Sequence, residues 1–340
     1  MATITRSGLR MPAEWSRHRR TLTAWPDQSS QKDGNILQGA ERDVAAISNA
    51  IVEFEPVTLL CRPGNVSRAK ALLSPSVAIQ EMEVDELWLR DTGPVYVKTA
   101  EGTVVGIDFN FNYWGGKYEG TIDQTVARSV LDHDATARVQ APLVAEGGGI
   151  EVDGEGTLLM TESSVINDNR NPGQTKEQLE DHLKTLLGVQ KVIWLKGLKG
   201  LDITDAHVDA TARFASPGRV ILNRPAKTAR KAFIDAWEDD RRVLAAAKDA
   251  KGRSLEVVEI EEADTTKFDG DEYETCLSYL NYLLVNGGLI MPKFGDQAAD
   301  DGAFTLLQQL FPDRKVVQVQ LDSLRKLGGG IHCATQQQPE

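Results

Sequence analysis

A cysteine near the end of the 340-residue chain directly follows a glycine-rich stretch, Gly328-Gly329-Gly330-Ile331-His332-Cys333. Consecutive glycines let a backbone pass where side chains would collide, and they tolerate a positive φ. A thiol and its neighbouring N–H groups can thereby come close to a ligand, which makes Cys333 a candidate nucleophile. A glycine-rich turn with an incidental cysteine would explain the same stretch. The case for chemistry therefore depends on partners for the thiol elsewhere in the chain.

Two further segments place a carboxylate beside turn-forming residues. Asp91 lies shortly before Gly93-Pro94, which forces a turn, and Glu146 precedes three glycines. Either carboxylate could face a ligand. The structural alternatives are that Asp91 bonds the backbone of its own turn, as aspartates in turns commonly do, and that the glycines after Glu146 form a hairpin or a bulge.

A histidine and two aspartates lie together in Thr204-Asp205-Ala206-His207-Val208-Asp209. If Val208 begins a strand, His207 and Asp209 point to the same face, because strand side chains repeat every two residues. Such a pair suits proton transfer or metal binding. A single histidine more often has a structural role, but neighbouring carboxylates would tune this one, and we favour function. The other histidines are less persuasive candidates: His18, His133, His182 and His332.

Composition narrows the classes of partner. The net charge of −12 argues against nucleic acid and anionic membranes, because both require a basic face. It would suit a small cationic substrate. The three cysteines are far apart, so we expect no disulfide framework and no CxxC metal site. The first 20 residues have no apolar core, and the most apolar run, 279–291, is too short to span a bilayer. We therefore expect a cytoplasmic protein.

The elements that must position these residues alternate between strands and helices, which predicts an α/β fold. No linker or low-complexity segment divides residues 1–340, so we expect a single domain, and no internal repeat is visible by eye. The phosphate-binding motifs of doubly wound nucleotide folds are missing. The predicted strands are 57–61, 77–82, 95–98, 104–108, 157–160, 192–195, 220–223, 255–260, 289–292 and 316–321. The predicted helices contain 44–51, 69–73 after an Asn65 cap, 120–131, the segment from a Thr175–Gln178 capping box to Gly188, 227–248 and 303–310.

Taken together, these segments resemble the agmatine deiminase family, the bacterial peptidylarginine-deiminase-like branch of the guanidine-modifying superfamily. The resemblance runs from about residue 10 to the end of the chain, in the order that the family has. Its segments are 11–15, 24–26, 88–94, 111–118, 146–149, 169–172, 204–209, 294–296 and 328–333.

The resemblance implies a five-bladed α/β propeller (pentein) of ββαβ units around a central channel. It also implies that residues 1–340 form one catalytic domain. It places the nucleophile at Cys333 and the general acid/base at His207, with Glu146 beside it. It places the guanidinium-binding carboxylates at Asp91 and Asp209. Further substrate contacts are implied at Trp88, as an aromatic wall of the pocket, and at Gly330.

The chemistry of a guanidinium explains why these residue types would be needed. It is planar and always charged at neutral pH, so carboxylates on either side can each accept its N–H bonds and hold the central carbon. A thiolate is a strong nucleophile near neutral pH. We expect Cys333 to attack the carbon and His207 to protonate the departing ammonia. Water, deprotonated by His207, would then hydrolyse the S-amidino intermediate. No step requires a metal or an organic cofactor.

The sequence departs from the family pattern around the histidine, which usually reads Gly-Asp-Glu-Thr-Asp-Gly-His-Val-Asp-Asn. Ile203 stands where the family has Glu, Ala206 where it has Gly, and Ala210 where it has Asn. Asp27-Gln28-Ser29-Ser30 also replaces the usual Arg-Pro-Asn-Trp. These changes leave the guanidinium chemistry intact, but they leave the far end of the substrate open.

The predicted reaction is hydrolysis of agmatine to N-carbamoylputrescine and ammonia, within putrescine and polyamine metabolism. Deimination of arginine or peptidyl-arginine is the first alternative, followed by amidino transfer to an amine. A third alternative is a metal-dependent ureohydrolase, because residues 205–209 resemble the manganese-binding DAHxD segment of arginases. That family's other ligand segments are missing, and Cys333 would be left without a role. A non-catalytic binder of guanidino compounds is the last alternative. A homo-oligomer and the direction of the pathway stay open.

Overall fold

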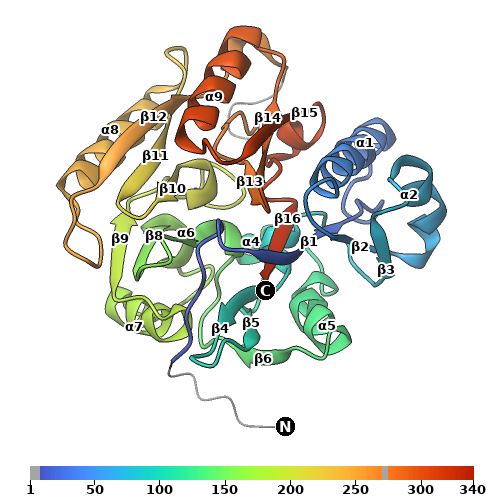
Figure 1. The fold of residues 1–340 in the computed structure, drawn as a ribbon, viewed down its shortest axis with the longest axis horizontal. Helices are drawn as coiled ribbons and strands as arrows, with labels where there is room; N and C mark the ends of the chain where they lie inside the picture. Colours follow the sequence, from blue (N-terminus) through green and yellow to red (C-terminus); the bar gives the residue numbers. More distant parts are fainter. Residues whose placement is uncertain (1–7, 270–274) are drawn as a thin grey trace. The chain divides into compact units, whose positions relative to one another are not determined.

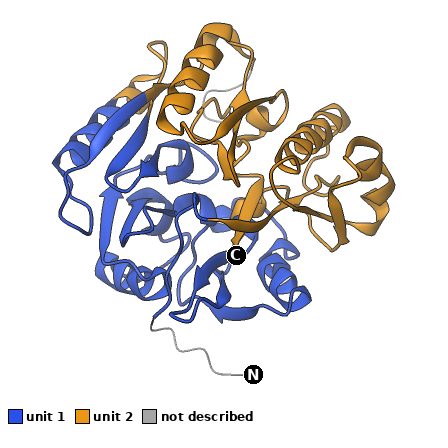
Figure 2. Cartoon of the chain, in the orientation of Figure 1, with its two compact units in different colours: residues 1–16, 91–222, 235–259 blue, residues 17–90, 223–234, 260–340 orange. Residues whose placement is uncertain are grey.

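The computed structural model describes residues 8–269 and 275–340. Within them the strands form five sheets (Figure 1). The chain divides into two compact units, coloured separately in Figure 2. Unit 1 comprises residues 1–16, 91–222 and 235–259, and unit 2 comprises 17–90, 223–234 and 260–340. The α/β prediction is thereby confirmed, and the sheets combine antiparallel and parallel pairs.

The sheets of unit 1 repeat one connection pattern. Two strands pair as an antiparallel hairpin, a helical segment follows, and a third strand then joins the second one. The first sheet contains β4 (Val95–Lys98), β5 (Val104–Asp108) and, after α5 (Val126–His133), β6 (Ala137–Gln140). The second contains β7 (Glu151–Val152), β8 (Thr157–Thr161) and, after α6 (Glu162–Val165) and α7 (Lys176–Leu187), β9 (Lys191–Leu195). The third contains β10 (Ala212–Ser216), β11 (Arg219–Arg224) and, after α8 (Lys231–Ala246), β12 (Glu256–Glu261), with the ends of β11 and β12 assigned to unit 2.

Unit 2 contains the same pattern twice. One sheet pairs β13 (Leu283–Val285) with β14 (Gly288–Lys293) and, after α9 (Gln297–Leu310), adds β15 (Lys315–Gln320) in parallel. In the other, the hairpin partners come from opposite ends of the chain, and β16 lies beside β1 in Figure 1. That sheet has the order β16 (Thr335–Pro339), β1 (His18–Ala24), β2 (Val57–Cys61) and β3 (Ala78–Glu81), with α1 (Gly34–Ile51) and α2 (Val66–Leu72) in the connections.

Strand β8 shows how the core of unit 1 is built. All five of its residues are buried, which is typical of a strand covered on both faces. Leu158 packs into one apolar cluster, with β5 and α7, whereas Leu159 packs into another, with β10 and β11. Because successive side chains alternate between faces, one strand serves two cores.

Helix α7 follows its sequence signals closely. The Thr175 side chain accepts from the Gln178 backbone N–H, the Gln178 side chain accepts from the Thr175 N–H, and the predicted capping box is confirmed. Leu179, Leu183 and Leu186 are buried on one face. Gly188 ends the helix at φ 67°, where a Cβ would lie 1.9 Å from the Leu9 carbonyl oxygen. Glycine is therefore required there for both conformation and space.

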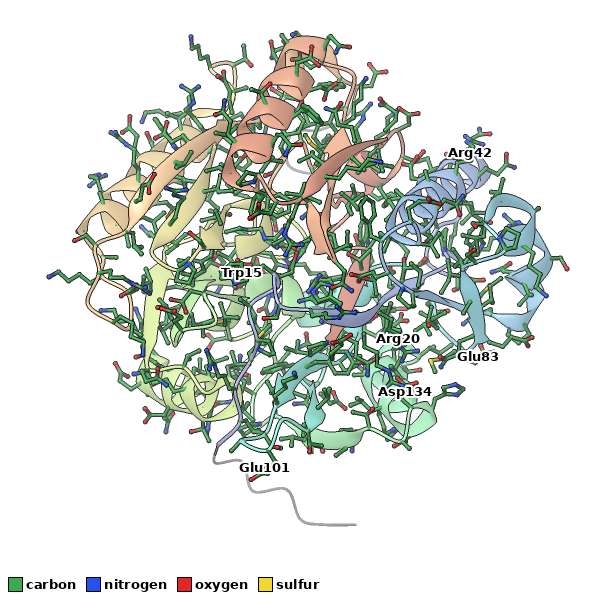
Figure 3. The ribbon with its side chains drawn as sticks, viewed as in Figure 1. Trp15, Arg20, Arg42, Glu83, Glu101 and Asp134 are labelled. Atoms are coloured by element: carbon green, nitrogen blue, oxygen red, sulfur yellow. The ribbon has the colours of Figure 1, made fainter. Side chains whose placement is uncertain are left out.

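Charged side chains occupy the solvent-facing positions of both units. In Figure 3, Arg42 on α1 and Glu83 after β3 project from unit 2, and Glu101, in the turn between β4 and β5, projects from unit 1. Within the parts of the chain that the structure describes, no helix combines the length and the apolarity needed to cross a membrane.

Several local predictions were wrong. No strand begins at Val208, because residues 208–210 form a 3₁₀ turn and the strand starts at Ala212. Asn65 precedes α2, but its side chain donates to Asp27 and caps nothing. The helix expected at 120–131 begins as a 3₁₀ turn at Asp123, and α8 begins four residues after the expected start at about 227. The helix predicted to contain 303–310 is confirmed, and it begins at Gln297. Strands β1, β6, β7, β10, β13 and β16 were not predicted.

Candidate functional site

The five hairpins share a feature at their starts. Within five residues before the first strand of each hairpin, a turn carries a polar or thiol side chain that is buried. Four of these turns hold residues predicted from the sequence, and the turn before β13 adds one that was not. They are Asp91 before β4, Glu146 before β7, His207 and Asp209 before β10, Asn281 before β13, and Cys333 before β16.

His207 and Glu146 form a buried hydrogen-bonded pair in unit 1. His207 Nε2 donates to Glu146 Oε2 at 3.2 Å. Burial alone would lower the pKa of His207, but the charges of Asp91 and Glu146, with the Glu146 hydrogen bond, raise it to about 9. Burial pushes the pKa of Glu146 upward, and the His207 hydrogen bond and the Arg170 guanidinium hold it below its usual value. The pair is therefore an imidazolium and a carboxylate at neutral pH.

The second nitrogen of His207 faces Asp91. Among the residues that the structure describes, His207 Nδ1 has no hydrogen-bond partner, and it lies 3.7 Å from Asp91 Oδ1. Asp91 itself accepts from the Gly148 N–H at 3.0 Å and from Trp114 Nε1 at 2.9 Å. Burial raises the pKa of the Asp91 carboxyl. The charge of His207 lowers it, and the neighbouring carboxylates Glu146 and Asp209 raise it, so that the net shift is upward. A second cation beside Asp91 would oppose that shift.

Gly148 explains how these groups come so close together. A Cβ on this residue would lie 2.5 Å from His207 Nδ1, 3.0 Å from Asp91 Oδ1 and 3.2 Å from Asp209 Oδ2. Because Gly148 has no side chain, an imidazole nitrogen and two carboxylate oxygens can converge beside its backbone. The sequence predicted that the Glu146 carboxylate faces a ligand or that its glycines form a hairpin or a bulge, and the structure shows a 3₁₀ turn over Gly147–Gly149.

A buried arginine that the sequence did not single out as a site residue supports the His207–Glu146 pair from behind. Arg170 Nε donates to Glu146 Oε1 at 2.9 Å, and its Nη1 donates to Asp205. Lys117 Nζ lies 2.9 Å from Asp205 Oδ2. The Arg170 side chain is fully buried between two carboxylates. The segment Asn169-Arg170-Asn171-Pro172 carried a signal for this role, because an arginine in a turn that ends at a proline can pair with carboxylates of an acidic site.

The segment before His207 is a tightly bonded turn. The Asp202 carboxylate accepts from the N–H groups of Thr204 and Ala206, and the Thr204 hydroxyl accepts from the His207 N–H. Asp205 and Ala206 have φ values of 61° and 68°. Two left-handed residues in succession turn the chain and prevent a strand from starting at Val208. His207 and Asp209 are nevertheless both buried, at the two ends of a short turn.

In unit 2 the glycine run brings the backbone beside other groups, as predicted. Gly328 has φ 86°, a Cβ on Gly329 would lie 2.4 Å from the Trp88 ring, and a Cβ on Gly330 would lie 2.7 Å from Asn281 Oδ1. The stretch therefore uses both properties of glycine, positive φ and close approach. Cys333 has a thiol outside any disulfide, and the residue is 9% exposed.

Two residues, Arg90 and Asn281, bond to the loop that carries Cys333. Arg90 donates through its backbone N–H to the Cys333 carbonyl and through Nε to the His332 carbonyl. Asn281 contacts Cys333 with both atoms of its amide.

Each predicted site residue can now be located. Unit 1 brings Asp91, Glu146, His207 and Asp209 together. In unit 2, Trp88 lies against Gly329, and Gly330 and Cys333 both lie against Asn281. In residues 8–269 and 275–340, no group of three or more His, Cys, Asp or Glu side chains is arranged to hold a metal ion.

Comparisons with known proteins point in one direction. Residues 10–339 match the family described as Porphyromonas-type peptidyl-arginine deiminase. The agmatine deiminase of Pseudomonas aeruginosa is 38% identical over 370 residues, which cover 98% of this chain and 96% of that protein. The agmatine deiminase of Stutzerimonas stutzeri is 38% identical over 378 residues, which cover 100% and 99%. A solved structure of the agmatine deiminase of Enterococcus faecalis matches with a TM-score of 0.87 at 30% identity, covering 98% of this chain and 96% of that one.

Proposed function

The chain belongs to the agmatine deiminase family, and from that premise we propose that it hydrolyses agmatine to N-carbamoylputrescine and ammonia. The observation that carries the proposal is the convergence of Asp91, Asp209 and His207 Nδ1 beside Gly148, in a buried part of unit 1. Burial and neighbouring carboxylates raise the pKa of Asp91. The imidazolium of His207 offsets this only in part, because three carboxylates surround it, and a guanidinium supplies a second cation with matching N–H geometry.

The substrate guanidinium is held by Asp91 and Asp209, each accepting N–H bonds from it. The Trp114 indole and the Gly148 N–H keep the Asp91 carboxylate in one orientation, so the guanidinium plane is fixed with it. Trp88 and Gly330 contribute further substrate contacts. Agmatine is the substrate named for the relatives.

The Cys333 thiolate attacks the guanidinium carbon, forming a C–S bond and a tetrahedral adduct. The adduct collapses as one nitrogen takes a proton from His207 and leaves as ammonia, giving an S-amidino cysteine. Water then attacks the same carbon while His207 accepts its proton. Breaking the C–S bond releases the ureido product and restores the thiolate. The thiolate and the imidazole supply every step, so we propose that neither a metal nor an organic cofactor takes part.

The electrostatics of His207 suit the first half-reaction. A pKa of about 9 keeps the imidazole protonated at neutral pH, so a proton is ready for the departing ammonia. Its Nε2–H is engaged by Glu146, so Nδ1 is the nitrogen that transfers the proton. Glu146 orients the ring and stabilises its charge, as the third group of a catalytic triad does.

At the level of the fold, we propose that the five sheets are the blades of a pentein propeller and that residues 1–340 act as one catalytic domain. The five hairpin starts, each with a buried side chain in its first turn, support this arrangement. So does the likeness to the solved agmatine deiminase structure. A crystal structure with a guanidino ligand tests it: the five turns should surround the ligand.

The test of activity compares guanidino compounds. Purified protein is incubated with agmatine, arginine or a peptidyl-arginine, and ammonia, ureido product and urea are measured with and without EDTA. We expect ammonia and N-carbamoylputrescine from agmatine, unaffected by EDTA. If only arginine is turned over, arginine replaces agmatine as the proposed substrate. Release of urea would refute deimination.

Variants test the assigned roles. Cys333→Ala should abolish turnover while agmatine still binds, and His207→Ala should stop both half-reactions. Cys276→Ala is the matched control, because this cysteine is partly exposed and outside the proposed site. Full activity of Cys333→Ala would contradict the mechanism.

A further inference from the structure

Asn281 touches the Cys333 loop on several sides. Its Nδ2 lies 3.1 Å from Cys333 Sγ, and its Oδ1 accepts from the Cys333 backbone N–H at 3.2 Å. Its own carbonyl accepts from the His332 N–H at 3.1 Å. The side chain is completely buried, in the turn before β13. One amide thus contacts both the backbone and the sulfur of the same residue.

The orientation of this amide is fixed by its surroundings. The oxygen and nitrogen of an asparagine can be interchanged unless the hydrogen bonds decide between them. A backbone N–H can only donate, so the atom that faces the Cys333 N–H must be Oδ1. Nδ2 therefore faces Sγ and directs an N–H bond at it. A thiolate is a better acceptor for that bond than a neutral thiol, because the bond is then charge-assisted.

We propose that Asn281 stabilises the thiolate form of Cys333 by donating this hydrogen bond, and that it holds the sulfur in the position from which it attacks. The meaning of the inference for catalysis rests on the function proposed above, in which Cys333 is the nucleophile. The inferred effect on the thiol does not depend on any substrate.

The repeat pattern supports the inference independently. The turns before β4, β7, β10 and β16 carry Asp91, Glu146, His207 and Cys333, all of them assigned to the reaction. The remaining turn, before β13, carries Asn281. Asn281 is therefore the contribution that the fourth hairpin makes at the corresponding place. An uncharged donor is the appropriate group there, since a carboxylate would repel the thiolate.

A purely structural role is the alternative, in which Asn281 only holds the loop through Oδ1 and its backbone. Two substitutions separate the roles. Asn281→Asp keeps the size of the side chain and the acceptor for the Cys333 N–H, but it replaces the N–H donor by an oxygen. Asn281→Ala removes both contacts. A structural role predicts that Ala leaves the thiolate midpoint unchanged and that only Asp raises it, through its added charge. Thiolate stabilisation predicts that both variants raise the midpoint and that Asp raises it more.

The experiment measures the ionisation of Cys333 directly. Wild-type protein and variants are treated briefly with iodoacetamide between pH 5 and 10 and digested with trypsin. Mass spectrometry then follows alkylation of the peptide from Leu327 to Glu340, in which Cys333 is the only cysteine. The pH midpoint of the alkylation rate reports the thiolate. We expect a rise of roughly one pH unit for Asn281→Ala, as losing one charge-assisted hydrogen bond implies, and a larger rise for Asn281→Asp.

Asn286→Asp is the matched control. The amide of Asn286 clamps His18 in the same way, accepting from its N–H and donating to its carbonyl, and this asparagine is not among the contacts of Cys333. The Asn286→Asp substitution introduces the same charge into unit 2, and it should leave the alkylation midpoint of Cys333 unchanged. Thermal denaturation of each variant verifies folding.

The outcomes separate this inference from the proposed function. An unchanged midpoint in a folded Asn281→Ala, with wild-type agmatine turnover intact, overturns the role of Asn281 and leaves the function standing. A raised midpoint in both variants, with no guanidino compound consumed by the wild type, supports the role of Asn281 and overturns the function instead.

Discussion

Replacing Glu146 by glutamine isolates the charge that tunes His207. The glutamine keeps an oxygen that can accept from Arg170 Nε, so the buried arginine retains this hydrogen bond. What disappears is the negative charge beside His207 Nε2. We therefore expect the pKa of His207 to fall from about 9 toward its ordinary value of 6.5.

The magnitude follows from the same shift. Raising a pKa from 6.5 to about 9 corresponds to roughly 3 kcal/mol of interaction favouring the imidazolium. Asp91, Glu146 and Asp209 share this effect, and Glu146 supplies both a hydrogen bond and a charge. We assign it about one to two pH units. Because the folded-state pKa is raised, the stabilisation that His207 contributes is complete below pH 6.5 and is lost as the pH rises to about 9. In Glu146→Gln that loss should finish at a correspondingly lower pH.

The assay is the pH profile of kcat for ammonia release from agmatine between pH 6 and 10. If His207 is the acid, the alkaline limb should move down by one to two pH units in Glu146→Gln. An NMR titration of the imidazole should move by the same amount. Glu162→Gln is the control, because Glu162 is a more exposed acid in the same unit that pairs with Lys176. An alkaline limb that stays in place while the variant remains folded would refute the assignment.

Three further predictions concern stability, each measured by urea denaturation. Arg170→Leu leaves two buried carboxylates without their guanidinium and should destabilise by about 3–5 kcal/mol; a loss below 1 kcal/mol would contradict the buried network. Ala206 has a left-handed backbone, so Ala206→Gly should stabilise the folded protein by about 0.5–1 kcal/mol. The control is Ala236→Gly inside α8, which should destabilise it by about 1 kcal/mol. Equal effects of the two substitutions would argue against backbone strain at Ala206. Thr175→Ala removes the N-cap of α7 and should cost about 1 kcal/mol, and no change would mean that the cap contributes little.

Signals that are local in the sequence were read correctly. Strands β2, β4 and β5 have the predicted bounds because apolar runs between turn residues have few other interpretations. The capping box of α7 depends on two residues three positions apart, so it too is visible in the sequence. The turn at His207 was misread because the positive φ values of Asp205 and Ala206 arise from bonds to Asp202 and Thr204 that no periodicity reveals.

Features that depend on distant partners could not be read locally. Strand β1 has arginines and threonines in place of an apolar run, and it is a strand because β2 and β16 flank it. The five hairpin repeats share a strand-pairing pattern, and their sequences differ enough that no repeat is visible by eye. Asn281 lies within the apolar run 279–291. A buried asparagine in such a run requires polar partners, and that requirement was the available signal.

The sheet that joins the two ends of the chain has a consequence for folding order. The Thr23 hydroxyl bonds the Ala334 carbonyl across 311 positions, and closing such a loop in an unfolded chain costs about 5 kcal/mol before any contact compensates. Prior folding of the other sheets shortens this loop, so β16 should dock last. Cys333 is two residues from β16 and acquires its place with it. During refolding, tryptophan burial should therefore recover before catalytic turnover. The intermediate between the two should be almost completely folded but catalytically inactive.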